Sequence, residues 1–205
     1  DEFYDRIKNI NKSSEIPSTS APSVADIYAT LDELVEKGYT DVIHYPISFE
    51  LSSTGSTVQT LAEEYSDRIN VHVINTKTAA FVQGYMALEA KRMADEGKSV
   101  EEIIEYSNYL VENNRVYFLV DDLNYLVKNG RLSNAAGFLG SLFKIKPILT
   151  ITKDGKIESL EKVRTYQKAL KRVEELILNY IGDHKNVVTF GFHSNKIDSL
   201  QELIN

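Results

Sequence analysis

Hydroxyl-bearing side chains gather in three short stretches of the sequence, residues 18–23, 52–57 and 76–78. Each stretch comes just before a segment with helical apolar spacing, and two of them directly follow an apolar run typical of a buried strand. Loops at the carboxyl ends of parallel strands meet at one edge of a sheet, where ligands bind. Hydroxyls and the free N–H groups of helix N-termini stabilise negative charge. We therefore expect a pocket for a small anion.

The same hydroxyls also suit a structural role as helix caps. Ser23, Ser56 or Thr57, and Thr78 each stand where an N-cap side chain would accept a hydrogen bond from the first turn of a helix. At any single stretch the two interpretations are equally good. Three such stretches in one predicted α/β region favour a shared anion site.

The sequence lacks the motifs of common catalytic centres. It has no cysteine, and its four histidines show no metal-ligand spacing. The nucleophile elbow G-x-S-x-G, the Walker A motif and G-x-G-x-x-G are also absent. These absences favour a binding protein over an enzyme, with no metal ion and no cofactor.

Basic residues stand at the ends of several predicted elements. Arg131 follows a predicted helix, Lys146 precedes Pro147, and Arg164 ends the second strand of a predicted hairpin. Each could pair with an acidic ligand or partner, through bidentate contacts in the case of arginine. The simpler interpretation is a surface cation or a contact with a helix C-terminus.

The composition is that of a soluble globular protein. Of 205 residues, 42% are apolar and 26% charged, and the formal net charge of −7 argues against a nucleic-acid partner. No apolar run is long enough for a transmembrane helix, and no signal peptide is evident. The absence of cysteine fits a reducing compartment, so we expect a cytoplasmic protein. Because Asp1 opens the sequence and a predicted helix reaches Asn205, we expect a fragment that lacks residues at both ends.

The order of predicted elements changes near the middle of the chain. Up to residue 113, helices alternate with strands at 41–47 and 69–74, which predicts a parallel sheet between helices. After residue 114 we expect an α+β domain with a mainly antiparallel sheet. Its predicted parts are a strand at 116–120, helices at 123–128 and 135–143, hairpin strands at 147–152 and 156–163, a helix at 166–180, a strand at 187–192 and a helix at 196–203. The expected domains are therefore 1–113 and 114–205.

Several segments together resemble the DegV family, over nearly the whole chain. Residues 123–132, which read Leu-Asn-Tyr-Leu-Val-Lys-Asn-Gly-Arg-Leu, and residues 146–149 carry the resemblance first. Residues 19–23 are similar to the family's T-S-x-P-S turn, and residues 47–54 to its I-S-x-x-L-S-G-T turn. Residues 74–78 stand at the family's V-x-D-S turn, and residues 162–165 match its K-V-R segment. These motifs keep the family's order.

The resemblance implies a protein that binds a long-chain fatty acid between two α/β domains of the EDD fold. It assigns the carboxylate to Thr19 and Ser52. Neighbouring ligand candidates are Ser20, Ser53, Thr54, Thr76 and Arg131. Phe138 and Phe143 would contact the tail, with Phe81, Ala136, Leu139, Leu142 and Ile145 as further lining. The resemblance also implies presentation of the acid to a fatty acid kinase for phospholipid synthesis, and we assign Arg164 to that partner.

The sequence departs from the family's pattern at three positions in these turns. The family's L-S-G-T-Y is replaced by a version with Ser53 and Gly55, and the Asp of D-S is Asn75. Two alternatives stay open. The chain could be a subunit of a small-molecule kinase or enzyme related to dihydroxyacetone kinase, or an interaction module whose hydroxyls are only caps. A peripheral membrane contact also fits a lipid-binding role.

Overall fold

The computed structural model describes residues 2–8, 10, 16–133, 145–182 and 184–204. The chain divides into two compact units. Residues 21–116 and 150–158 form one, which we call the parallel unit, and residues 1–20, 117–149 and 159–205 form the other, the antiparallel unit.

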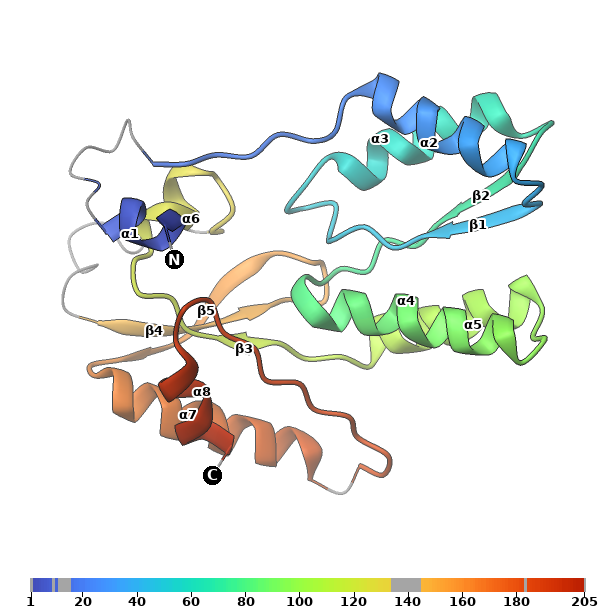
Figure 1. Cartoon of the computed structure of the whole chain (residues 1–205). Helices are drawn as coiled ribbons and strands as arrows, with labels where there is room; N and C mark the ends of the chain where they lie inside the picture. The colour runs from blue at the N-terminus through green and yellow to red at the C-terminus, as the bar shows by residue number, and fades with distance from the viewer. Residues whose placement is uncertain (1, 9, 11–15, 134–144, 183, 205) are drawn as a thin grey trace. The chain divides into compact units, whose positions relative to one another are not determined.

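The parallel unit is a two-stranded parallel sheet with helices on both faces. Strand β1 (Asp41–His44) pairs with β2 (Asn70–Val73) from Asp41 opposite Asn70 to His44 opposite Val73. Figure 1 shows α2 and α3 on one side of these strands and α4 and α5 on the other. The helical elements are α2 (Val24–Glu36), α3 (Thr54–Ala62), the 3₁₀ turn η2 (Glu63–Tyr65), α4 (Ala80–Asp95) and α5 (Val100–Glu112).

Two apolar clusters hold these layers together. Leu31 of α2, Val58 of α3 and Tyr65 of η2 are buried together on one face of the sheet. Ile74, which follows β2, and Met86 of α4 are buried on the other. Val42 of β1 and the two valines of β2 pack against the first cluster, and Ile43 of β1 packs against the second, so β1 sends apolar side chains to both faces.

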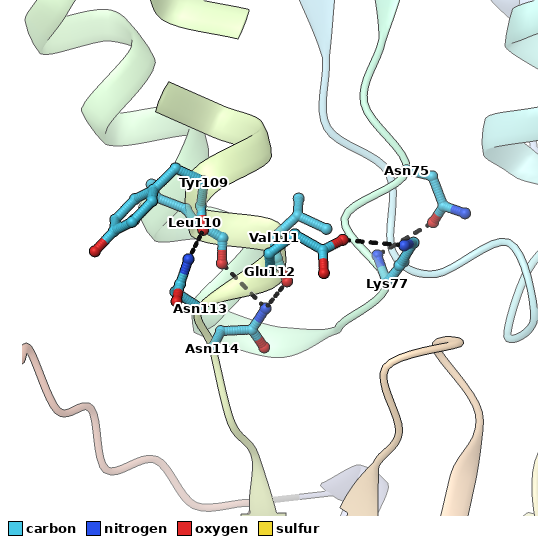
Figure 2. Close-up of polar contacts among 8 residues, drawn as sticks. All are labelled: Asn75, Lys77, Tyr109, Leu110, Val111, Glu112, Asn113 and Asn114. Carbon is cyan, nitrogen blue, oxygen red and sulfur yellow. Dashed lines mark hydrogen bonds and ion pairs between the residues drawn. The ribbon is translucent and has the colours of Figure 1, made fainter. Parts of the chain in front are cut away.

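Local signals fix where several of these helices begin and end. Ser23 Oγ accepts a hydrogen bond from the Asp26 N–H (3.2 Å) and starts α2 with a capping box, and Ser99 starts α5 in the same way. At the end of α5, the Asn113 and Asn114 side chains donate to the Tyr109 and Val111 carbonyls, each at 2.8 Å (Figure 2). The Tyr109 carbonyl also accepts the Asn113 N–H at 3.1 Å, so the side-chain amides add hydrogen bonds to carbonyls of the last turn of α5.

The antiparallel unit is built on a three-stranded sheet. Its strands run in the order β3 (Tyr117–Phe118), β4 (Lys146–Ile151) and β5 (Ile157–Val163), and the sheet is antiparallel. Ile148 of β4 is buried against Ala169 and Val173 of α7. The helices are α1 (Glu2–Lys8), α6 (Asn124–Lys128), α7 (Tyr166–Ile181) and α8 (Ile197–Ile204).

The predicted fold class is confirmed, with a parallel α/β unit and an antiparallel sheet in the second half. The chain passes from the parallel to the antiparallel unit after Val116. Residues 1–20, which come before the parallel unit in the sequence, belong to the antiparallel unit, and residues 150–158, at the tip of the β4–β5 hairpin, belong to the parallel unit. The assignment of a segment to a unit depends on contacts between residues far apart in the sequence. The spacing of apolar residues along the chain does not predict such contacts.

The strand predicted at 187–192 is wrong. That segment is irregular, and Val188 and Phe192 are more than half exposed. Apolar β-branched and aromatic side chains favour strands only where a neighbouring strand accepts the backbone hydrogen bonds. The helix predicted at 135–143 lies outside the described residues. Among the residues that are described, no helix is long and apolar enough to cross a membrane.

Candidate functional site

The turn after β1 brings two hydroxyls of the second stretch together. Ser52 Oγ lies 3.0 Å from Thr54 Oγ1 and accepts a hydrogen bond from the Thr54 N–H at 3.2 Å. Both side chains are half-buried. Only one hydroxyl proton can lie between the two oxygens, so the other proton is not used in this contact. Ser53 is exposed beside them.

The start of α3 is pressed closely against this turn at Gly55. A Cβ atom at Gly55 would lie 2.2 Å from Phe49 Cε1 and 2.6 Å from Pro46 Cγ, so a side chain does not fit. Ser53 is the N-cap residue of α3, but its side chain makes no capping hydrogen bond. Thr57 lies inside the helix, so the predicted cap at Ser56 or Thr57 is wrong. The first N–H groups of α3 are therefore not satisfied by a side-chain cap at Ser53.

Ser48 organises the same turn, although the sequence alone did not mark it as a site residue. Its carbonyl accepts the N–H groups of Leu51 (2.9 Å) and Ser52 (3.1 Å). Its own N–H donates to the Thr78 carbonyl at 2.8 Å, which joins the turns that follow β1 and β2. Ser48 is completely buried. Its place in the I-S-x-x-L-S pattern was the available signal.

The turn after β2 uses its hydroxyls differently. Thr76 is completely buried, and its hydroxyl donates to the Pro46 carbonyl at 2.7 Å. Thr78 is also completely buried, and its Oγ1 has no hydrogen-bond partner. The N-cap residue of α4 is Ala79, so the predicted cap at Thr78 is wrong. Of the three predicted N-caps, only Ser23 caps its helix.

Lys77 ties the turn after β2 to the end of α5. Asn75 Oδ1 accepts the Lys77 N–H at 3.1 Å, and Lys77 Nζ lies 3.3 Å from Glu112 Oε1 (Figure 2). Lys77 has a φ of 49°, in the left-handed region that disfavours a residue with a side chain. Asn75 thus supports the backbone of the turn through its side-chain oxygen.

The remaining predicted site residues belong to other segments of the chain. Thr19 and Ser20 are exposed in an irregular segment and belong to the antiparallel unit, whereas Ser52, Thr54 and Thr76 belong to the parallel unit. Arg131 is half-buried, and its guanidinium donates to the Asn129 carbonyl.

Arg164 is exposed between β5 and α7, and Phe81 is 45% exposed on α4. The tail candidates Phe138 and Phe143, with Ala136, Leu139 and Leu142, lie outside the described residues.

Titratable groups near the strands do not form a catalytic cluster. Burial lowers the pKa of His44, whose Nε2 is enclosed without a partner, so this ring is neutral at pH 7. The hydrogen bond from His72, at 3.0 Å, lowers the pKa of Asp41. Within the described ranges, no group of three or more His, Asp or Glu side chains could hold a metal ion.

A separate polar cavity of about 250 Å³ lies in the antiparallel unit. Asp121, Asp122 and Lys146 are among its lining residues. Lys146 Nζ donates to the Asp121 carbonyl at 3.0 Å, and Lys196 forms an ion pair with the Asp121 carboxylate at 3.1 Å. These charges already pair with groups of the chain itself. The rest of the lining is largely apolar, namely Val120, Leu123, Pro147 and Ile145, and Ile145 is one of the predicted tail-lining residues.

The fold and these turns define a mixed α/β protein with one parallel and one antiparallel sheet. The model of the DegV family, described as an uncharacterised protein family, matches residues 1–205. The chain belongs to the DegV family. The DegV domain-containing protein YqaC of Lactococcus lactis is 36% identical over 203 residues, which cover 99% of this chain and 71% of that protein.

Solved structures agree with this assignment. A fatty acid binding DegV family protein from Streptococcus agalactiae superposes with a TM-score of 0.87 at 32% identity, over 98% of this chain and 70% of that one. DegV from Bacillus subtilis, described as a fatty acid binding protein, gives a TM-score of 0.74 at 36% identity, over 86% of this chain and 61% of that one.

Proposed function

We propose that this protein binds a long-chain fatty acid and holds its carboxylate with hydroxyl groups. The observation that carries the proposal is the Ser52–Thr54 hydroxyl pair at the start of α3, a helix whose N-cap residue makes no side-chain hydrogen bond to it. The solved relatives described as fatty acid binding proteins support the choice of ligand.

The chemistry of the pair suits a carboxylate. Removing an ionised carboxylate from water is costly unless hydrogen bonds replace its hydration. One free hydroxyl proton and the N–H groups of a helix N-terminus would supply such bonds. Thr19, Ser20, Ser53, Thr76 and Arg131 remain proposed ligands. Burial of the acyl tail, for which we propose Phe138 and Phe143 as contacts, would add roughly 0.8 kcal/mol per CH₂.

We further propose that the protein is a carrier and not an enzyme. It would present the carboxylate to a fatty acid kinase in the cytoplasm, as a supply step for phospholipid synthesis, with no cofactor of its own. Arg164, which is exposed, is the proposed contact for an acidic patch on that kinase. The alternative function is a subunit of a small-molecule kinase or enzyme related to dihydroxyacetone kinase, which would bind a small phosphorylated or hydroxylated substrate at the same turns.

Binding of radiolabelled oleate to delipidated protein tests the head-group assignment. Ser52→Ala combined with Thr54→Val should weaken binding at least tenfold, because both hydroxyls of the pair are lost. Thr60→Val is the matched control, since its hydroxyl also lies on α3 but donates to the Ser56 carbonyl on the exposed face. Equal affinity of the double variant and the control would refute the assignment.

A further inference from the structure

The turn between β4 and β5 lies directly against Ser48. Gly155, at its tip, is buried and has a φ of +86°. A Cβ atom at this position would lie 2.1 Å from Ser48 Oγ, 3.0 Å from Ser48 Cβ and 3.3 Å from Lys77 Cα. The hairpin therefore touches both hydroxyl turns of the parallel unit at a point where only glycine fits.

The turn itself is held in a fixed shape. The Gly155 N–H donates to the Thr152 carbonyl, and the Thr152 N–H donates to the Lys156 carbonyl, each at 2.9 Å. Lys156 Nζ lies 3.8 Å from Glu50 Oε2, beside the contact with Ser48. A turn with these internal hydrogen bonds moves as one piece, so a displacement of the hairpin is passed to the residue that it touches.

Ser48 connects this contact to the proposed carboxylate ligands. Its carbonyl accepts the Leu51 and Ser52 N–H groups, and the Ser52 hydroxyl in turn meets Thr54. Gly155, Ser48 and Ser52 thus form one continuous chain of contacts within the parallel unit. The strands that carry the turn begin and end in the antiparallel unit, at residues 146–149 and 159–163.

We infer that the Gly155 turn positions the Ser52 hydroxyl by holding Ser48 in place. Gly155 is a positioning residue, because it acts through Ser48 and does not contact the ligand. The inference rests on the proposed fatty acid function. It makes the tip of the hairpin a support of the carboxylate site, whose position sets the geometry, and hence the affinity, of that site.

Gly155→Ala tests this link against Gly97→Ala. Gly97 has nearly the same backbone conformation, with a φ of +77°, but a Cβ atom there would meet nothing within 4 Å, so its variant reports backbone strain alone. We expect Gly155→Ala to speed amide hydrogen exchange of Leu51 and Ser52 at least tenfold and to weaken oleate binding by a similar factor. Gly97→Ala should change neither.

Ser48→Gly provides the rescue. It removes both atoms that the new methyl group would meet most closely, so the exchange rates of the double variant should return to those of Ser48→Gly alone. A Gly155→Ala protein that melts at a lower temperature but keeps wild-type exchange at Leu51 and Ser52 would overturn the inference. Absence of oleate binding by the wild-type protein would instead refute the proposed function, because the exchange measurement needs no ligand.

If the Gly155→Ala protein does not fold, the variant Lys156→Glu tests the same inference. It sets a negative charge against Glu50 at an exposed position and leaves the glycine intact. The exchange of Leu51 and Ser52 should then rise about threefold. Unchanged exchange in that variant would contradict the link.

Discussion

The two units of the chain differ sharply in charge. The parallel unit carries 18 acidic and 9 basic side chains, whereas the antiparallel unit carries 12 acidic and 14 basic ones. The proposed carboxylate ligands Ser52 and Thr54 therefore lie in the acidic unit. We propose that these neutral hydroxyls contact the carboxylate, whereas the further proposed ligands Thr19, Ser20 and Arg131, and the proposed partner contact Arg164, belong to the more basic unit.

The largest expected effect on stability comes from shortening a core side chain in one unit while the core of the other unit stays intact. Ile148 is completely buried in the antiparallel unit, and Met86 is 1% exposed in the parallel unit. Ile148→Ala and Met86→Ala should each lower the free energy of unfolding by about 2–5 kcal/mol. Calorimetry should show each variant shifting a different transition if the units unfold separately. A single transition shifted equally by both would mean that the units are one cooperative block.

A smaller loss is expected from overpacking beside the hydroxyl pair. Gly55→Ala places a methyl group 2.2 Å from Phe49 Cε1, so Phe49 or the start of α3 must move. We expect a cost of about 1–3 kcal/mol by urea denaturation, together with weaker fatty acid binding. Gly84→Ala is the control, because Gly84 also lies in a helix and its Cβ atom would be 3.5 Å from Phe81 Cδ2, an ordinary contact. Equal stability of the two variants would contradict the close contact at Gly55.

The caps give a still smaller and more selective effect. Ser23→Ala should cost about 1 kcal/mol, since the Ser23 hydroxyl accepts the Asp26 N–H and caps α2. Ser53→Ala should cost almost nothing in stability, because the Ser53 side chain makes no cap hydrogen bond. Thermal melts of both variants check this. A larger loss for Ser53→Ala would show that its hydroxyl is a cap after all.

The stabilities of the two units should depend on pH in different pH ranges. Burial lowers the pKa of His44, so the unfolded chain binds a proton there more readily than the folded one. Stability of the parallel unit should fall as pH drops through about 6.5, the ordinary pKa of histidine. His44→Asn should remove that part of the pH dependence in urea titrations between pH values of about 7.5 and 5.5, which bracket that pKa. An unchanged slope would exclude His44 as its source.

The antiparallel unit should respond only at lower pH. The hydrogen bond from Arg172, at 2.8 Å, lowers the pKa of Glu161. This contribution is present above the pKa of Glu161 in the unfolded chain and is lost as pH falls through the lower folded value. Glu161→Gln should therefore flatten the acid side of the stability curve slightly, since both side chains are about one-third exposed. A change near neutral pH would point to another group.

The sequence was informative wherever the signal is local. The predicted cap at Ser23 is confirmed at the start of α2, because a capping residue and the N–H group that it accepts lie within four residues. The hydroxyl stretches were found for the same reason. That the Thr76 hydroxyl donates to the Pro46 carbonyl depends on two turns that meet only in the folded sheet.

The failures also have a physical cause. The segment 187–192 has strand propensity but is irregular, and propensity does not supply a neighbouring strand. Gly155 was visible as part of a hairpin turn. Its contact with Ser48, more than a hundred residues away, could not be deduced from spacing.

Native mass spectrometry of the purified wild-type protein tests the central claim most directly. The account predicts a species heavier than the bare chain by the mass of one long-chain fatty acid, which disappears after delipidation and returns when oleate is added. Ser52→Ala with Thr54→Val should appear mostly as the bare chain under the same conditions. A wild-type protein that takes up no fatty acid after addition of oleate would contradict the account.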